Sequence, residues 1–502
     1  MSEHRPSLPG RPTSLWLDTT PETNFPPLHE GVEVDVAVVG GGLAGLTAAT
    51  LLKEAGLTVA VLEAGRIVTG VTGHTTAKIT ALHTLIYDHL IRHFGEAKAR
   101  AYGEAQQAAI ERIEAVVKDK AIDCDFTRTE AYTYAEEADG VEAVEAEARA
   151  ALSLGLPASL VREVPLPFPV KAAVRFDRQA RFHPRKYLLA LAWDIPGEGS
   201  HIFEATRVLD VDQGEPCTVS TDRGTVKARE VIVASHFPFG DKALFASRLQ
   251  PQRSYVLAVR IDGPAPPGMF IDTAESFSLR PQPLPDGEEL LLITGEGHKA
   301  GEGGDTAACY QRLELMARHR LPVRSVEYRW STQDNFTLDR VPYIGRTTHH
   351  SRHLSVATGF NGWGMTGCTV AGMLLTDLIL GRANPWAEVF DPSRLDLASL
   401  PELVKHNAKV AAHFVADRVG GTDSDTIPPG EGRIVHSLHG NVALYRDEEG
   451  QVHRLSPVCT HMGCILHWNP AERSWDCPCH GSRFGYDGEV LHGPAVKPLE
   501  RK

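Results

Sequence analysis

Residues 34–64 read VDVAVVGGGLAGLTAATLLKEAGLTVAVLEA. The apolar residues at 34–39 predict a strand, and the glycines after them predict a turn that opens a helix. A second apolar run at 58–62 predicts another strand. The stretch therefore predicts a βαβ unit, from which dinucleotide-binding α/β domains are built.

The spacing of three glycines in this unit indicates a pyrophosphate site. Gly40 allows the tight turn after the strand, Gly42 lets the backbone approach a phosphate, and Gly45 lets the helix pack closely on the strand. The N-terminus of the helix faces the phosphates. Glu63 ends the second strand, where an acid binds the hydroxyl pair of a ribose. The alternative, a glycine-rich turn with only a packing role, is disfavoured by this setting.

The composition is that of a globular protein with an acidic balance. The chain has 502 residues, which at about 150 residues per domain suggests roughly three domains. The formal net charge of −13 argues against nucleic acid or an anionic membrane as the main partner. No run of about 20 apolar residues is present, so no membrane span is expected. The first residues lack the apolar stretch of a secretory signal, so we expect a loose N-terminal arm and a cytoplasmic protein.

Changes in texture along the chain divide it into four segments. Residues 1–30 form the arm, and residues 31–395 combine the βαβ unit with later strands and helices. Residues 396–426 contain a predicted amphipathic helix over 401–419 and the start of the linker GGTDSDTIPPGEG. Residues 427–502 contain short strands and turns, and this segment is too short to build a large core.

A second glycine-rich turn, TGFNGWGMT at 358–366, again leads from a predicted strand into a predicted helix. Together with the glycine- and threonine-rich segment 66–78, it makes residues 31–395 resemble the glycine oxidase and D-amino-acid oxidase-like FAD oxidoreductases. The resemblance implies a Rossmann-like FAD-binding domain interrupted by a mostly β substrate domain, with the flavin ring near 74–78 and 359–365. The FAD-binding residues that it implies are Gly40, Gly42, Leu43, Ala44, Gly45, Glu63, Ala64, Arg66, Thr75, Thr76, Gly359, Asn361, Gly362, Gly364, Met365 and Thr366.

Four of the eight cysteines crowd near the C-terminus, in the boxes Cys459-Thr-His461-Met-Gly-Cys464 and Cys477-Pro-Cys479-His480. In a reducing compartment such a cluster indicates a metal site before it indicates disulfides. Two cysteines and two histidines would suit zinc. Each box also carries a further cysteine in a matching place, and glycines where a backbone must turn around a cofactor. From the residues alone, structural zinc and a set of disulfides stay open beside an iron–sulfur centre.

The two boxes closely resemble the Rieske pattern, and the resemblance covers residues 427–502. It implies a small all-β domain that binds a 2Fe–2S cluster. The ligands that it implies are Cys459 and Cys477 on one iron and His461 and His480 on the other. In the respiratory-type subgroup the two further cysteines form a disulfide, which here would join Cys464 to Cys479.

Two residues after the second box bear on the potential of the cluster. Ser482 matches the serine whose hydroxyl donates to a cluster sulfide, and Phe484 stands where high-potential members carry a tyrosine. Hydrogen bonds to sulfur stabilise the reduced cluster, so we expect a potential below the top of the Rieske range of about −150 to +300 mV. Tyr486 would replace the missing donor if its loop folded back.

A flavin and a one-electron cluster in one chain suggest a path for electrons. We expect a dehydrogenase that oxidises a small organic substrate, by family likeness an amine or amino acid, and passes single electrons through the cluster to an external acceptor, a protein or a quinone. No second glycine fingerprint follows a strand, so no NAD(P)H site is expected. Two alternatives stay open. In one, a donor reduces the cluster and the cluster reduces the flavin, for a reductase or monooxygenase reaction. The other is a non-enzymatic electron-transfer or redox-sensing protein.

Four side chains are candidates for contact with the substrate or the flavin ring. His74 and Lys78 follow the fingerprint, and Arg253 and Tyr255 open a predicted strand. An arginine there could bind a carboxylate in a bidentate manner. The alternative for this pair is a surface arginine and a core tyrosine. His236, at the end of an apolar strand, is expected to cap a turn rather than to react.

Overall fold

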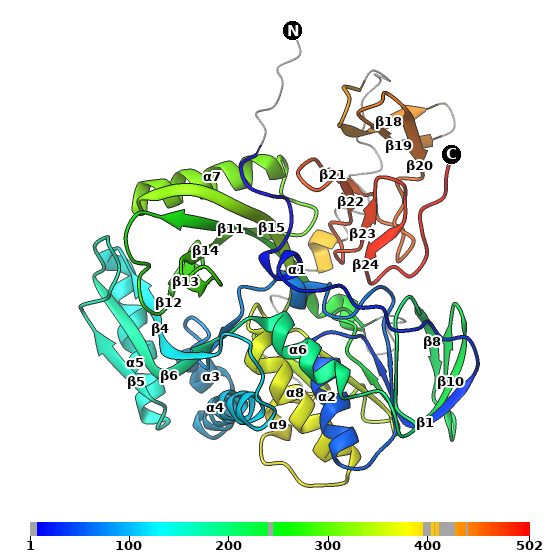
Figure 1. Ribbon diagram of the computed structural model, residues 1–502, viewed down its shortest axis with the longest axis horizontal. Helices are drawn as coiled ribbons and strands as arrows, with labels where there is room; N and C mark the ends of the chain where they lie inside the picture. The colour runs from blue at the N-terminus through cyan, green and yellow to red at the C-terminus, as the bar shows by residue number, and fades with distance from the viewer. Residues whose placement is uncertain (1–7, 239–243, 395–402, 406, 411–426, 438–439) are drawn as a thin grey trace.

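The computed structural model of the protein describes residues 8–238, 244–394, 403–405, 407–410, 427–437 and 440–502. This part of the chain forms two large sheets, with helices packed on them, and two small sheets near the C-terminus (Figure 1). The α/β-plus-β fold class expected from the sequence is confirmed.

An eight-stranded sheet forms the Rossmann-like layer. Its path is β16–β17–β10–β1–β2–β7, and the antiparallel strands β8 and β9 extend it beside β10. Strands β1, β2, β7, β10 and β17 are parallel, so their carboxyl ends meet at one edge. The strands are β1 (Val32–Val39), β2 (Val59–Leu62), β7 (His201–Phe203), β8 (Val208–Asp212), β9 (Cys217–Thr221), β10 (Gly224–Val233), β16 (Tyr343–Arg346) and β17 (Leu354–Thr358).

The parallel strands are apolar throughout because both faces of this sheet are covered. Along β1, Val36 and Val38 belong to the core that contains the helices, whereas Ala37 and Val39 belong to a second core with β8–β10. Helices α2 (Leu43–Glu54) and α8 (Gly364–Ile379) pack against each other in the first core. Burial of consecutive residues explains the continuous apolar run of the sequence.

A nine-stranded, mostly antiparallel sheet forms the second large layer. Its path is β15–β11–β14–β13–β12–β4–β6–β3, with β5 beside β6. Helix α7 (Thr306–Arg320) packs on β11 and β14. The strands are β3 (Lys78–Ile79), β4 (Thr127–Ala135), β5 (Ala158–Val161), β6 (Ala172–Arg181), β11 (Leu249–Ile261), β12 (Met269–Asp272), β13 (Phe277–Pro283), β14 (Glu289–Lys299) and β15 (Val323–Thr337).

Shorter helices connect and flank these layers. Helices α3 (Tyr87–Phe94) and α4 (Glu96–Asp119) meet at Gly95, whose φ of 81° ends the first helix and precedes the second. The remaining helices are α1 (Leu15–Asp18), η1 (Val71–His74), η2 (Ala138–Gly140), α5 (Val141–Ser153), α6 (Pro184–Trp193), η3 (Phe245–Ser247) and α9 (Ala387–Phe390). Among the described residues, none of the helices has the length and apolar character needed to cross a bilayer.

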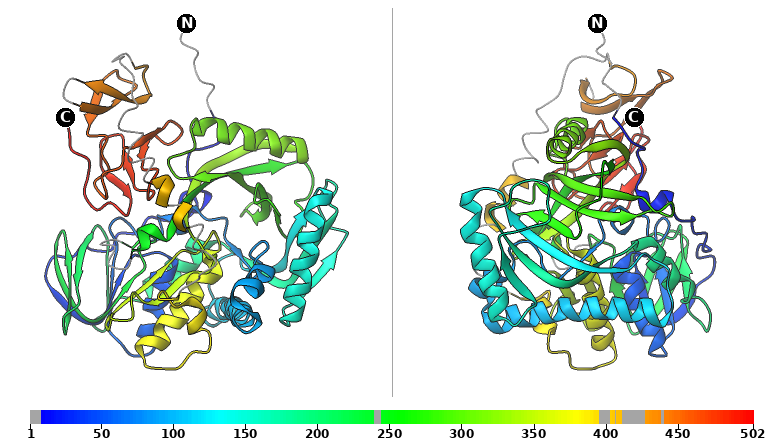
Figure 2. Two further views of the ribbon diagram at one scale, coloured as in Figure 1. Left: turned by 180° about the vertical axis from the view of Figure 1, so that it is seen from behind. Right: turned by 60° about the vertical axis from the view of Figure 1, so that its left-hand side comes forward.

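The C-terminal part consists of two small antiparallel sheets. Its core contains the buried Trp475 and Phe484 together with the four clustered cysteines, and Trp468 packs against it. The four-stranded sheet lies nearer to the large sheets than the three-stranded one (Figures 1 and 2). The strands are β18 (Gly432–Ser437), β19 (Gly440–Arg446), β20 (Val452–Leu455), β21 (His467–Asn469), β22 (Ser474–Asp476), β23 (Arg483–Gly485) and β24 (Val490–His492).

The N-terminal segment 8–30 is not the loose arm that the sequence predicted. Trp16 is fully buried, and its indole nitrogen donates to the carbonyl oxygen of Thr75 at 2.6 Å. Further along, the buried carboxylate of Glu204 accepts hydrogen bonds from the Thr23 hydroxyl and from the Phe25 amide, the latter at 2.9 Å. The segment is therefore a strap across the sheets. Most of the predicted helix 401–419 and the start of the linker lie outside the described residues.

Candidate active site and metal centre

A cavity of about 480 Å³ lies at the carboxyl edge of the eight-stranded sheet. The loops after β1, β10 and β17 contribute Gly42, Phe237 and Asn361 to its wall. The nine-stranded sheet contributes Lys78 among others, and the C-terminal part closes the cavity with residues 490–496. Three parts of the chain that are distant in sequence thus share one cavity.

The glycine fingerprint is shaped by close backbone packing. Gly40 has a φ of 111°, and a methyl group there would lie 2.5 Å from the carbonyl oxygen of Ala234. A methyl group on Gly45 would lie 2.0 Å from the carbonyl oxygen of Gly40. Gly45 does not line the cavity, so its part is to bring helix α2 onto the turn. Larger residues at either position would force the turn apart.

The carboxylate of Glu63 is held in a fixed orientation in the cavity wall. It accepts hydrogen bonds from the amides of Gly41 and Gly65, at 2.8 and 2.9 Å. Burial raises the pKa of Glu63 above its usual range, although these two hydrogen bonds act in the opposite direction. Each oxygen keeps a lone pair that can accept from a ribose hydroxyl. The geometry therefore fits the ribose-binding role expected for this residue.

The residues expected to bind FAD divide into two groups. Those that line the cavity are Gly40, Gly42, Leu43, Ala44, Glu63, Ala64, Thr75, Thr76, Asn361, Gly362, Gly364 and Met365. Arg66 does not line it, because its exposed side chain pairs with Glu22. Thr366 is turned away and donates to the carbonyl oxygen of Thr80 at 3.0 Å. Gly359 also lies outside the wall and is packed against Thr337.

Lys78 is the only one of the four catalytic candidates that lines the cavity. Its ammonium group donates to the hydroxyl of Ser278, which also lines the cavity. Burial, and after it the neighbouring guanidinium of Arg280, lowers the pKa of Lys78 to about 7. The cavity wall therefore holds an amine that can gain or lose a proton near neutral pH.

The other three candidates do not point into the cavity, which corrects the expectation of substrate contact. Arg253 is buried, and its guanidinium bonds Ser331, Gln333 and Glu472. The fully buried Tyr255 has its hydroxyl 2.9 Å from Nε2 of His298. Nδ1 of His74 lies 2.8 Å from the carbonyl oxygen of Gly70, and burial lowers the pKa of its imidazole. These three side chains are therefore structural in this arrangement.

Sequence reasoning missed two adjacent residues of the cavity wall, His236 and Phe237. His236 has a φ of 67°, and its carbonyl oxygen accepts from Asn335 at 3.1 Å and from Thr358 at 2.5 Å. Its ring lies 4.9 Å from the ring of His492, which belongs to the C-terminal part and also lines the cavity. A position directly after a parallel strand was the available signal for His236 and Phe237. No local pattern marks His492, because only the docking of the two parts brings it there.

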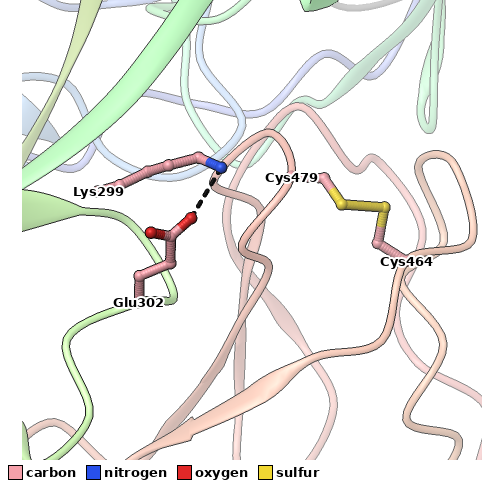
Figure 3. Close-up of a disulfide and its surroundings, with 4 residues drawn as sticks. All are labelled: Lys299, Glu302, Cys464 and Cys479. Atoms are coloured by element: carbon pink, nitrogen blue, oxygen red, sulfur yellow. Dashed lines mark ion pairs between the residues drawn. A yellow bond between two sulfur atoms is a disulfide. The ribbon is translucent and has the colours of Figure 1, made fainter. Parts of the chain in front are cut away.

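The two cysteine–histidine boxes form a pair of adjacent loops. The amide of Gly463 donates to the carbonyl oxygen of Cys459 at 2.9 Å, and the amide of Gly481 donates to that of Cys477 at 3.1 Å. A disulfide between Cys464 and Cys479 joins the two loops covalently (Figure 3).

The remaining sulfur and nitrogen donors converge between these loops. The thiol of Cys477 interacts directly with that of Cys459 and lowers the pKa of Cys459 below its usual range. The rings of His461 and His480 lie 5.1 Å apart. Nδ1 of His461 is buried and has no hydrogen-bond partner among the described residues. Two thiols and two imidazoles in this arrangement fit a Rieske cluster.

The loop after β10 connects the cavity to the cluster histidines. The buried ring of Phe237 lies 6.4 Å from the ring of His461 and 6.3 Å from that of His480, edge-on to both. The same residue lines the cavity. One aromatic side chain thus contacts both sites.

A buried network of opposite charges holds the C-terminal part against the nine-stranded sheet. Arg253 lies 3.2 Å from Glu472 and 3.6 Å from Asp476, and Arg483 pairs with both acids. Burial alone would raise the pKa of Asp476, but Arg483 and Arg253 together lower it. Beside the disulfide, Lys299 pairs with Glu302 at 2.9 Å at the end of β14 (Figure 3).

Comparisons with known proteins agree with this geometry. Residues 35–378 match the DAO family of FAD dependent oxidoreductases, and residues 420–501 match the Rieske [2Fe-2S] domain. The chain is 40% identical to the Rieske 2Fe-2S iron-sulfur protein YhfW of Bacillus subtilis (strain 168), over 98% of this chain and 97% of that protein. It is 27% identical to the gamma-glutamylputrescine oxidoreductase of Escherichia coli (strain K12), over 72% of this chain and 87% of that protein. The structure of glycine oxidase from Geobacillus kaustophilus is similar, with a TM-score of 0.62 at 19% identity. The similarity covers 72% of this chain and 99% of that one.

Proposed function

Because the chain belongs to the DAO family of FAD-dependent oxidoreductases and carries a C-terminal Rieske domain, we propose that it is a dehydrogenase with a built-in one-electron outlet. The protein is an enzyme that binds FAD and a 2Fe–2S cluster. When bound, FAD accepts an electron pair from a substrate and the cluster carries electrons one at a time. In this proposal electrons leave the flavin through the cluster to an external acceptor.

The position of Phe237 is the observation that carries the proposal. Its ring contacts the imidazoles of His461 and His480 on one side and lines the FAD cavity on the other. Electron tunnelling slows steeply with distance, so a cluster that served only an outside partner would not need its histidines packed against a residue of the cavity wall. The segment 490–496 supports the same reading, since it lines the cavity and its Ala495 amide donates to Ser482 at 3.1 Å.

We further propose the residues that hold the two groups. FAD would lie along the cavity-lining residues of the glycine fingerprint, Glu63 and the turn around Asn361. Cys459, His461, Cys477 and His480 would bind the cluster. Lys78, with a pKa near 7, would take up or release a proton beside the substrate. Gly45, Arg66, Gly359 and Thr366 would support the FAD site without lining it.

The proposed substrate is a small amine or amino acid. One relative by sequence is named for gamma-glutamylputrescine and one by fold for glycine, and both compounds contain an amino nitrogen. Membership of a family of enzymes argues against the non-enzymatic alternative. We also propose that the protein is cytoplasmic. The domain limits that we propose are 31–395 for the flavin part and 427–502 for the Rieske part.

A stoichiometric anaerobic reductive titration tests the direction of electron flow. Flavin would be followed by absorbance and the cluster by electron paramagnetic resonance. We expect the cluster to be reduced first, because an outlet must have a higher potential than the flavin that feeds it. A flavin that is reduced before the cluster would contradict the proposal and support the reverse flow. Cys459→Ala is the control, since it should remove the cluster signal and leave the flavin titration.

A further inference from the structure

The two cluster loops differ in what covers them. The second loop, which carries Cys477 and His480, packs onto the nine-stranded sheet. There the side-chain amide of Gln333 donates to the carbonyl oxygen of Gly481 at 2.9 Å. Packing is so close that a methyl group on Gly301 would lie 2.7 Å from the Cα of Pro478. His480 is only 4% exposed. An outside partner therefore cannot approach the cluster over the second loop without moving the C-terminal part.

The first loop, residues 458–463, lies open. Val458 is 38% exposed and Met462 is 54% exposed, and they stand immediately beside Cys459 and His461. Exposed apolar side chains are unremarkable when they are scattered singly. Here two of them flank the ligands of one loop, so this loop presents apolar surface directly beside the cluster ligands.

Four basic residues lie near the first loop through backbone contacts. The Thr460 hydroxyl donates to the carbonyl oxygen of Lys497 at 2.6 Å, which ties the last segment of the chain to the loop. Leu455 forms a bridge with Arg501, and the amide of Lys502 donates to the carbonyl oxygen of Arg454 at 3.1 Å. The four exposed basic residues near the loop are Arg454, Lys497, Arg501 and Lys502.

In the part of the chain that the structure describes, three of these four cations form no ion pair, and the ammonium group of Lys502 donates to the carbonyl oxygen of Asn441 at 3.1 Å. Among the described residues, no carboxylate lies within ion-pair distance of Arg454, Lys497 or Arg501. The last ten residues carry three basic side chains and one acidic one, Glu500, in a chain whose formal net charge is −13. The exposed acids Asp487 and Glu489 flank Gly488, whose carbonyl oxygen accepts from the amide of Leu499 at 2.9 Å, so with Glu500 they border the same surface. The four cations outnumber these three acids, so the surface has a local positive excess on a chain whose formal net charge is −13, and this excess favours an acidic partner.

We propose that Val458, Met462, Arg454, Lys497, Arg501 and Lys502, the first-loop surface, form the docking site of an acidic one-electron carrier protein. The proposal rests on the proposed function, because it supplies the external acceptor. An apolar centre with a charged rim is the composition of a transient interface, and complementary charge mainly speeds encounter. Each encounter moves one electron from the reduced cluster to the oxidised carrier, with no bond made or broken and no proton transferred. Two encounters remove the electron pair of one substrate molecule.

Small one-electron oxidants of opposite charge test the electrostatic part. The holoenzyme would be reduced chemically beforehand, and cluster reoxidation would be followed after mixing with ferricyanide or with tris(phenanthroline)cobalt(III). At low ionic strength the Lys497→Glu/Arg501→Glu variant should react at least several-fold more slowly with ferricyanide and faster with the cobalt complex. Salt should reduce both differences. The matched control is Arg352→Glu/Arg382→Glu, exposed residues of the flavin part with the same change of charge. Equal rates in the two double variants would overturn the proposal.

Protein carriers test the identity of the partner. Acidic plastocyanin and basic cytochrome c both accept one electron, and we expect plastocyanin to reoxidise the wild-type cluster faster. Met462→Glu should slow the plastocyanin reaction, whereas Leu315→Glu, at an exposed leucine of α7, should not. Reoxidation by decylubiquinone alone would overturn the proposal in favour of a quinone. Because the cluster is reduced beforehand, failure here is separate from failure of the flavin-to-cluster step, which the anaerobic titration reports.

Discussion

At the scale of single residues, the cluster site lacks one hydrogen bond that the Rieske pattern often supplies. Phe484 is fully buried in the core that contains the four cysteines, and it offers no donor. Tyr486 does not replace it. Its side chain is 40% exposed, and its ring packs on Tyr445 at 5.0 Å and on His453 at 5.3 Å. The possibility that Tyr486 folds back toward the cluster is therefore wrong.

Phe484→Tyr should raise the reduction potential of the cluster. A new hydrogen bond to sulfur stabilises the reduced form, and a bond worth about 1 kcal/mol corresponds to about 40 mV for one electron. Redox titration followed by electron paramagnetic resonance would measure the change. Phe484→Leu is the control, because it alters packing without adding a donor. A potential that shifts equally in both variants would show that packing, not the hydrogen bond, is responsible.

The residues that could be predicted are those whose role is local in sequence. The turn at Gly40 and the two cluster loops follow from spacing, because neighbours within a few residues determine them. Arg253 and Tyr255 could not be placed in this way. Which side of β11 faces the cavity depends on its pairing with β14 and β15. The orientation of the Arg253 side chain also depends on Glu472, which is 219 positions away.

At the scale of elements, the strap 8–30 is the feature that hydrophobic periodicity does not reveal. Its helix α1 has four residues, too few for a periodic signal. The longer elements were predictable because burial imposes the apolar pattern over many residues, as in β1 and α2. The strap is held instead by isolated contacts, of which the indole of Trp16 on Thr75 and the stacking of Arg280 over Trp16 are examples.

Trp16→Ala should therefore destabilise the flavin part and weaken FAD binding. Trp16 is fully buried, and truncation of such a side chain costs about 3–5 kcal/mol. The loss also frees the backbone of Thr75, which lines the cavity. Denaturant unfolding and the dissociation constant of FAD would measure the two effects. Leu315→Ala is the control, because Leu315 on α7 is 68% exposed and should change stability by about 0.5 kcal/mol or less. If both variants lost similar amounts of stability and FAD affinity, the burial of Trp16 would not be what stabilises the flavin part.

At the scale of the whole molecule, the two cofactor sites work together only if the C-terminal part keeps its orientation. The sequence predicts both parts, but their docked faces are made of residues far apart along the chain. The contacts at this interface include His467, with Nδ1 2.7 Å from the carbonyl oxygen of Gly301, and Thr306, whose hydroxyl donates to Asn469 at 2.7 Å. Arg253 forms charged contacts across the same interface, with Glu472 at 3.2 Å and Asp476 at 3.6 Å.

Arg253→Met should uncouple the two sites without destroying either. Removing one partner of a buried ion pair costs about 3–5 kcal/mol, because the other charge stays buried. The C-terminal part would then lose its fixed orientation. As a result, the cluster histidines would lose their contact with Phe237. After flash photoreduction of the flavin, we expect cluster reduction at least tenfold slower, with both cofactor spectra retained. Neutralising both partners in Arg253→Met/Glu472→Gln should restore part of the rate, since no unpaired charge remains. Arg473→Met breaks an exposed pair with Glu448 inside the C-terminal part and is the control. If Arg253→Met transferred electrons as fast as Arg473→Met, the buried pair would not be what orients the cluster.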